Sequence, residues 1–150
     1  MTMTPSVGTE LVNPKAGTRT VFTATAESTG GAYVEVEATY PPHGSKPPLH
    51  LHPTQVEEFT VLSGQLDVVR ADETFTVKAG DSFTVAAGTP HQMWSSGDDG
   101  AVTRWRTTPA QRTGEMFCEL WEAARDSDWS PDPMRLFEVI SSHPDEFCLC

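Results

Sequence analysis

The residues of this chain best suited to chemistry are three histidines and one glutamate: His50, His52, His91 and Glu57. Imidazole nitrogens and carboxylate oxygens are donors that divalent metal ions bind in proteins. The first two histidines are separated by one residue, Glu57 follows five residues after His52, and His91 lies in a second segment. If these side chains meet in the folded protein, they form a site for one divalent ion.

A strand over Leu49–His52 would point both of its histidines to the same side. Side chains alternate between the two faces of a strand, so His50 and His52 share a face, with Cα atoms roughly 6.5 Å apart. Two imidazoles at that separation can converge on one ion. A strand that begins at His91, after the turn Gly88-Thr-Pro90, would supply the third imidazole.

Glu57 opens the next predicted strand, in the same row as Phe59 and Val61. A carboxylate in an apolar row is costly to bury unless it binds a cation or another partner. Glu58 points to the opposite face, so we favour Glu57 as the metal ligand.

The elements that must position these residues are predicted to be short strands separated by Gly-centred turns. Alternation of apolar and polar residues is clearest from Tyr33 to Tyr40, which is typical of a half-buried strand. The predicted strands are Thr20–Thr25, Tyr33–Tyr40, Leu49–His52, Glu57–Leu62, Gln65–Arg70, Thr74–Lys78, Ser82–Ala86, His91–Ser95 and Ala101–Thr107. This pattern predicts an all-β sandwich or barrel.

The chain divides into three predicted parts: an N-terminal arm with a lead-in strand (1–32), a barrel (33–107) and a C-terminal helical extension (108–150). Thr108-Pro109-Ala-Gln111 resembles a helix start. The apolar residues that follow at helical spacing are Met116, Phe117, Leu120, Trp121 and Ala124. A second helix is predicted over Met134–Ile140, with one face formed by Met134, Phe137 and Ile140. We expect both helices to pack their apolar stripes on the barrel.

Composition narrows the function classes. A formal net charge of -11 disfavours binding to nucleic acid, because phosphate backbones would be repelled. No apolar run approaches the roughly 20 residues that span a bilayer. The start of the sequence lacks the basic and apolar regions of a signal peptide, so we expect a cytoplasmic protein.

Several polar residues outside the cluster are weaker candidates. Cys118, Cys148 and Cys150 are too few and odd in number for a disulfide framework, and we interpret the last two as thiols of a frayed tail rather than a soft-metal site. His143 is predicted to be exposed in the same tail. The predicted proline-rich loop, Pro41–Pro48, contributes His43 and Lys46 at the expected rim of the barrel, where they could meet a substrate. Solvated loop residues are the simpler interpretation.

Arg104 and Arg106 share one face of their predicted strand. Strand parity alone leaves open whether that face points into the barrel.

The histidine and glutamate spacing resembles the cupin family. The first family motif is Gly, five residues, His-x-His, three or four residues, Glu, six residues, Gly, and its positions are matched by Gly44, His50, His52, Glu57 and Gly64. The second motif is matched at Gly80, Gly88 and His91, whereas Ala86 replaces its Pro and Ser95 its Asn. The resemblance covers about Tyr33 to Thr107.

The resemblance implies a double-stranded β-helix, or jelly-roll barrel, with the family's four metal ligands at His50, His52, Glu57 and His91. It also implies a homodimer. The two departures from the motif are not at ligand positions. Such folds host many chemistries, so the motif says little about the reaction.

Three histidines and a carboxylate leave open positions on a five- or six-coordinate ion, as a catalytic site requires. The donors suit Fe, Mn, Ni, Co or Zn, and residue identity does not choose among these metals. By strand parity the cavity wall is apolar and aromatic, formed by Tyr40, Phe59, Val61, Phe83, Val85 and Met93. Such a wall suits a small, partly apolar organic substrate; ordinary barrel core is the alternative for Phe83 and Val85.

Three functions remain open. The first is a dioxygenase of the quercetinase type acting on a small aromatic or enolisable substrate, with Glu57 as a metal ligand that could also act as general base. The second is a non-redox cyclase or isomerase, in which the metal polarises a carbonyl. The third is a non-catalytic ligand-binding cupin.

Overall fold

The computed structural model of the protein describes residues 3–150; Met1 and Thr2, at the start of the predicted N-terminal arm, lie outside the described part. Two antiparallel sheets face each other. The first has the order β1 (Glu10–Asn13), β2 (Thr18–Ala24), β3 (Val34–Tyr40), β9 (Ala101–Thr108), β5 (Val56–Arg70) and β7 (Ser82–Val85). The second has the order β6 (Glu73–Lys78), β5, β8 (His91–Trp94), β4 (His50–Leu51) and β10 (Cys148–Leu149).

Strand β5 belongs to both sheets. Its first half pairs with β7 and β9, and its second half pairs with β6 and β8. The sequence prediction of two separate strands, Glu57–Leu62 and Gln65–Arg70, is therefore wrong. Gly64 has a φ of 74° and pairs with Ala101, so the chain bends there without leaving the ladder.

The remaining barrel strands are confirmed within one or two residues at most ends, because alternation sets their two faces. The hydrogen-bonded path of strands runs from β1 to β10 and does not close. The fold is thus the predicted all-β jelly roll, a double-stranded β-helix with helices added. Two short strands, β1 and β10, and the four-residue helix α1 (Ala26–Thr29) were not predicted.

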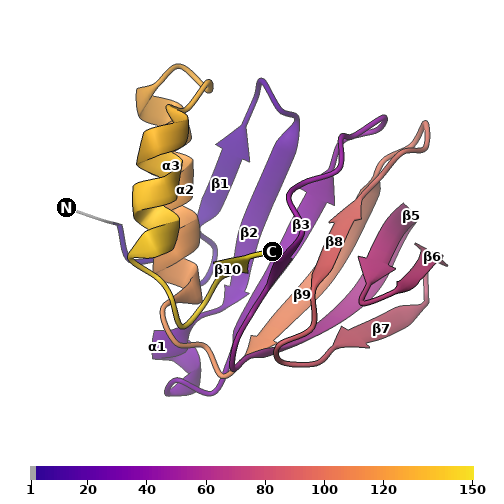
Figure 1. Ribbon diagram of the computed structural model, residues 1–150, viewed down its shortest axis with the longest axis horizontal. Coiled ribbons are helices and arrows are strands. Elements are labelled where there is room, and N and C mark those ends of the chain that lie inside the picture. The colour runs from indigo at the N-terminus through magenta and orange to yellow at the C-terminus, as the bar shows by residue number, and fades with distance from the viewer. Residues whose placement is uncertain (1–2) are drawn as a thin grey trace.

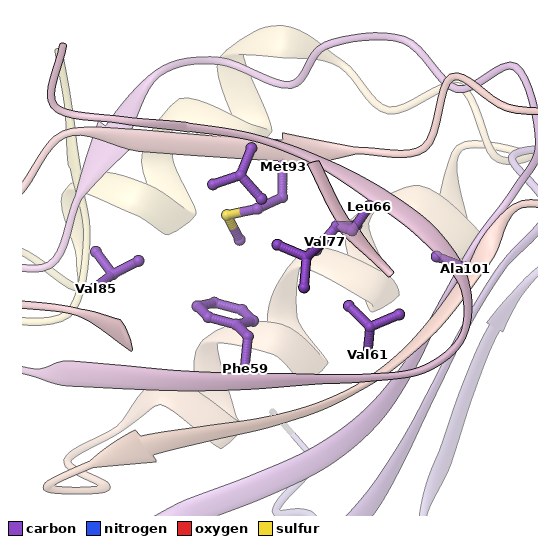
Figure 2. Close-up of a cluster of buried hydrophobic side chains, with 8 residues drawn as sticks. Phe59, Val61, Leu66, Val77, Val85, Met93 and Ala101 are labelled. Carbon is purple, nitrogen blue, oxygen red and sulfur yellow. The ribbon is translucent and has the colours of Figure 1, made fainter. Parts of the chain in front are cut away.

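The space between the two sheets holds the first core. It consists of Phe59, Val61, Leu66, Val68, Val77, Val85, Met93 and Ala101. Figure 2 shows Phe59 and Met93 pointing toward each other inside this cluster, from β5 in one sheet and β8 in the other. This core fixes the spacing of the sheets and so the separation of any side chains placed between them.

A second core lies where the first sheet extends toward β1. It consists of Leu11, Phe22, Val34, Val36, Ala38, Ala110 and Cys118, with Phe117 and Trp121 packed against it. The helix that covers this region is α2 (Thr113–Asp126), and Figure 1 shows it beside β1, away from β6 and β7. The expected packing of the first helical stripe on the sheet is confirmed.

Two helix predictions are corrected. The predicted start at Thr108-Pro109 is wrong: β9 continues to Thr108, held by pairing with Val56, and α2 begins only at Thr113. The second helix, α3 (Pro133–Ser141), packs on α2, but two residues of its predicted apolar face point outward, with Met134 63% and Phe137 58% exposed. Ile140, the third residue of the predicted face, is half-buried together with Leu136 and Val139.

Within residues 3–150, no helix is long and apolar enough to cross a membrane.

Candidate metal centre

Three strands place the predicted ligands between the two sheets. His50 lies on β4 and His91 on β8, and the two residues are direct partners across the ladder, so their side chains share a face. His52 follows β4 by one residue, and Glu57 lies near the start of β5. The second sheet thus supplies the imidazoles, and the part of β5 in the first sheet supplies the carboxylate.

The structure brings all four side chains together. One ligand nitrogen from each of His50, His52 and His91 lies within 4.8 Å of the others. Glu57 Oε1 lies 2.9 Å from His52 Nε2 and 2.9 Å from His91 Nε2. The strand-parity choice of Glu57 over Glu58 agrees with this arrangement, because Glu58 borders a polar hollow on the outer face with Arg104 and Arg106.

Each histidine is held in one orientation by a backbone carbonyl. His50 Nδ1 donates to Pro48 O at 3.0 Å, His52 Nδ1 to Glu146 O at 2.6 Å, and His91 Nδ1 to Thr89 O at 2.8 Å. A carbonyl oxygen only accepts, so the proton of each neutral ring is on Nδ1 and the lone pair is on Nε2. This is the arrangement that metal-binding histidines adopt in proteins.

Three buried atoms at the centre have no hydrogen-bond partner in the described residues: His52 Nε2, His91 Nε2 and Glu57 Oε1. Buried polar atoms without partners are costly, and lone pairs that face each other add repulsion. A divalent cation among these atoms would satisfy all of them, so the donor set fits a metal ion.

Glu57 is fully buried and is fixed from both sides. Its Oε2 accepts a 2.5 Å hydrogen bond from Trp105 Nε1 and lies 3.5 Å from Thr107 Oγ1. Burial alone would raise the pKa of Glu57, but His52 and His91 outweigh it and lower the pKa to about 2. The carboxylate is therefore ionised at neutral pH, suited to hold a cation and a weak proton acceptor.

The histidines differ in their charge state. Burial lowers the pKa of His50 to about 4, so its ring is neutral at pH 7. Burial also acts to lower the pKa of His52, but the Glu57 carboxylate and the Glu146 carbonyl reverse this effect and raise the pKa above 6.5. When no metal is present, the Glu57 carboxylate therefore makes the His52 ring bind a proton more readily than a free imidazole does.

The predicted cavity wall separates into two groups. Phe59, Val61 and Val85 are buried in the core, and Phe83 stacks on Phe59 with ring centroids 4.7 Å apart. Tyr40 and Met93 instead line an open cleft of about 530 Å³. The other residues of this cleft are Ala16, Thr18, Pro41, Pro42, His43, Gly44, Ser45, Pro47, Trp94 and Ser95.

The cleft approaches the metal centre along β8. Met93 lies two residues from His91 on the same face, so their Cα atoms are roughly 6.5 Å apart. Burial, and then the charge of Glu57, raise the pKa of Tyr40 well above its usual 10.0. Tyr40 is therefore a neutral phenol.

The weaker candidates fall outside the centre. His43 lines the cleft, and its Nε2 lies 3.0 Å from Asp98 Oδ1. The Lys46 ammonium group lies over the Trp94 ring. Arg104 and Arg106 point to the outer face, which settles the question that parity left open.

Two expectations for the tail are wrong. His143 was predicted to be exposed but is fully buried. The expected frayed end instead forms β10, although its thiols at Cys148 and Cys150 are exposed.

Sequence reasoning missed Trp105 and the contribution of Glu146. A signal for Trp105 was present, because it lies between Arg104 and Arg106 and alternation places it on the opposite, inner face. The Glu146 carbonyl had no comparable signal, since any residue type can supply a backbone oxygen.

The two facing sheets and the four donor side chains define a class of protein: a double-stranded β-helix with a candidate metal centre between its sheets. Residues 36–105 match the family model for the cupin domain, so this part of the chain is a cupin domain, and the solved structures that resemble the chain share its fold. No curated protein matches the chain.

Three similar structures illustrate the relation. An uncharacterized conserved protein with a double-stranded β-helix domain from Klebsiella pneumoniae is 21% identical, with a TM-score of 0.57 over 67% of this chain and 85% of that chain. A predicted oxalate decarboxylase from Thermotoga maritima is 20% identical, with a TM-score of 0.57 over 61% and 80%. Oxalate decarboxylase from Bacillus subtilis, which has Mn(II) centres, is 20% identical, with a TM-score of 0.59 over 74% and 30%. These identities establish the fold alone.

Proposed function

We propose that the protein is a metal-dependent enzyme that acts on a small, partly apolar organic molecule. The observation that carries the proposal is the convergence of His52 Nε2, His91 Nε2 and Glu57 Oε1, three buried atoms without partners, beside an open cleft. A purely structural metal site is closed by its protein ligands. Here four protein donors leave room for a substrate on an ion that accepts five or six.

The leading specific function is a dioxygenase acting on an aromatic or enolisable substrate. A divalent Fe, Mn, Ni or Co ion bound by these donors would supply the redox and Lewis-acid chemistry. The residues of the chain would do the rest: Tyr40, Met93 and the proline loop would orient the substrate, and the core around Phe59 would limit the entry of water.

In this proposal Glu57 is a ligand and not the general base. Its low pKa makes it a poor proton acceptor, and the hydrogen bond from Trp105 restrains any swing of the carboxylate. A substrate that binds as an anion, such as a catechol or an enol, would have to lose its proton to solvent water rather than to Glu57.

A second candidate, a non-redox cyclase or isomerase, is favoured by Tyr40. The phenol stays protonated because burial and the nearby Glu57 charge raise its pKa, so it could donate a hydrogen bond to a substrate carbonyl that the metal polarises. Neither step requires dioxygen. A non-catalytic role in binding a ligand is the third candidate and predicts metal and ligand binding without turnover.

Elemental analysis of protein purified without a metal-affinity tag separates these candidates. Fe, Mn or Ni, together with oxygen consumption on a panel of catechols and flavonols, supports the dioxygenase. Stoichiometric Zn without oxygen consumption supports the non-redox enzyme. A protein that binds no metal, even after reconstitution, would overturn both enzyme proposals.

A further inference from the structure

The terminal segment, residues 142–150, lies outside the region that matches the cupin domain yet borders the metal centre. Its strand β10 pairs with β4, which carries His50, in the register Cys148 with Leu51 and Leu149 with His50. Partners across an antiparallel ladder share a face. Leu149 therefore lies on the same face of the second sheet as His50.

Two contacts join the segment directly to the ligands. The Glu146 carbonyl accepts the 2.6 Å hydrogen bond from His52 Nδ1. The Phe147 ring stacks on the His50 ring, with centroids 4.6 Å apart and planes inclined by 14°. One residue thus orients a ligand and the next covers another ligand.

His143 anchors this arrangement from within the segment. Its ring is fully buried, with Nε2 2.9 Å from Glu119 Oε2 on α2 and Nδ1 3.4 Å from Glu146 Oε1. Its backbone carbonyl accepts hydrogen bonds from the amides of Glu146 and Phe147, at 3.2 and 3.1 Å. The turn that presents the Glu146 carbonyl to His52 is therefore tied to α2 through one imidazole.

We propose that the terminal segment supports metal binding by orienting the ligands. In it, His143 is a positioning residue that holds the Glu146 carbonyl against His52. The inference rests on the proposed metal-binding function. Without the carbonyl, His52 Nδ1 loses its acceptor, and the ring is free to rotate or to move its proton to Nε2, the atom that must bind metal. Loss of such a supporting contact typically costs about 10- to 100-fold in metal affinity.

The test is a Co²⁺ titration of the full-length protein in competition with a chelator, with the visible spectrum of bound Co²⁺ recorded. The variant His143→Ala should bind Co²⁺ about tenfold more weakly and show an altered spectrum, because the geometry of His52 changes. His143→Gln, whose amide can still donate to Glu119, should recover part of the affinity. Glu58→Ala, on the outer face of the first sheet, should bind as the wild type does.

A second variant covers the case in which His143→Ala does not fold. Phe147→Ala removes the ring that stacks on His50 at a half-buried position, and it should release Co²⁺ faster than the wild type. Folded His143→Ala with wild-type affinity and spectrum would overturn the inference, as would a loss of thermal stability without a change in Co²⁺ binding. If the wild type itself binds no Co²⁺, the proposed function fails and the inference fails with it.

Discussion

The two carboxylate oxygens of Glu57 have different tasks. Oε1 faces His52 and His91 at 2.9 Å, whereas Oε2 is held by Trp105 Nε1 at 2.5 Å. A carboxylate fixed at one oxygen presents the other in one direction. This division explains how a single acidic residue in an apolar row can be both buried and ready to bind a cation.

The ligand assignment predicts that His52→Ala greatly reduces metal binding, because it removes a donor and leaves Glu57 Oε1 without a partner on one side. We expect the Co²⁺ affinity to fall at least 100-fold in a chelator competition. The matched control is Glu58→Ala, one residue from Glu57 but on the outer face, which should bind Co²⁺ normally. Equal losses in the two variants would contradict the assignment.

Trp105 is predicted to support the centre through its indole N–H. Trp105→Phe keeps a ring that can stack near Phe59 but removes the donor to Glu57, so stability should fall by about 1–3 kcal/mol and metal affinity by roughly 10-fold. Denaturant unfolding and Co²⁺ titration measure the two effects. Trp121→Phe is the control, because its indole donates to the Val12 carbonyl far from the centre and its loss should leave Co²⁺ affinity unchanged.

Metal affinity should depend on pH through His52. Its pKa is raised above the usual 6.5, so lowering the pH through that pKa should add a proton that competes with the metal for Nε2 and should weaken Co²⁺ binding. One competing proton gives about a tenfold loss per pH unit below the pKa. His50, with a pKa of about 4, adds no competition in this range. Titrations between pH 8 and pH 5 that gave one constant affinity would contradict the assignment of this proton.

At the scale of elements, the bend in β5 brings Glu57 over the histidines. The bend is at Gly64, where a Cβ atom would lie 2.0 Å from the Gly100 carbonyl oxygen. We predict that Gly64→Ala destabilises the protein by about 2–4 kcal/mol in denaturant unfolding, since both the positive φ and the contact are unfavourable. Gly80 also has a positive φ but nothing within 4 Å of a Cβ, so Gly80→Ala should cost only about 1 kcal/mol.

The sequence predicted the parts of the fold that depend on local pattern. Alternation identified β3 and the faces of β5, and it separated Glu57 from Glu58, because the period of a strand is set by the backbone itself. The structure differs from the sequence prediction where tertiary contacts determine the ends of an element or the face that it buries. Pairing with β5 extends β9 to Thr108 and delays α2, and contact with α2 selects a different face of α3 than Met134 and Phe137.

The terminal segment could not be predicted for the same reason. Its strand has two residues, its link to His52 is a backbone carbonyl, and the burial of His143 depends on Glu119 in another helix. None of these features leaves a periodic signal. Trp105 is an intermediate case. Alternation along β9 predicts that its side chain lies on the inner face, but it does not predict the hydrogen bond to Glu57.

At the scale of the whole molecule, the metal centre joins the two sheets. The histidines come from the second sheet and its continuation, whereas Glu57 comes from the part of β5 that pairs with β7 and β9. An ion held by all four residues would therefore link elements that are otherwise joined by the core and by β5. The predicted homodimer and small-molecule substrate stay predictions.

Metal should consequently raise the stability of the whole fold and not only order a local loop. An ion that binds only the folded state, at a free concentration 100 times its dissociation constant, stabilises by about 2.7 kcal/mol, which for a chain of this size raises Tm by about 5–10 °C. Scanning calorimetry of the chelator-treated protein, with and without Co²⁺, measures this difference. The shift should be absent in His52→Ala and present in Glu58→Ala. A wild-type protein that bound Co²⁺ without any rise in Tm would show that the ion does not require the folded arrangement of both sheets, which would contradict the placement of the centre between them.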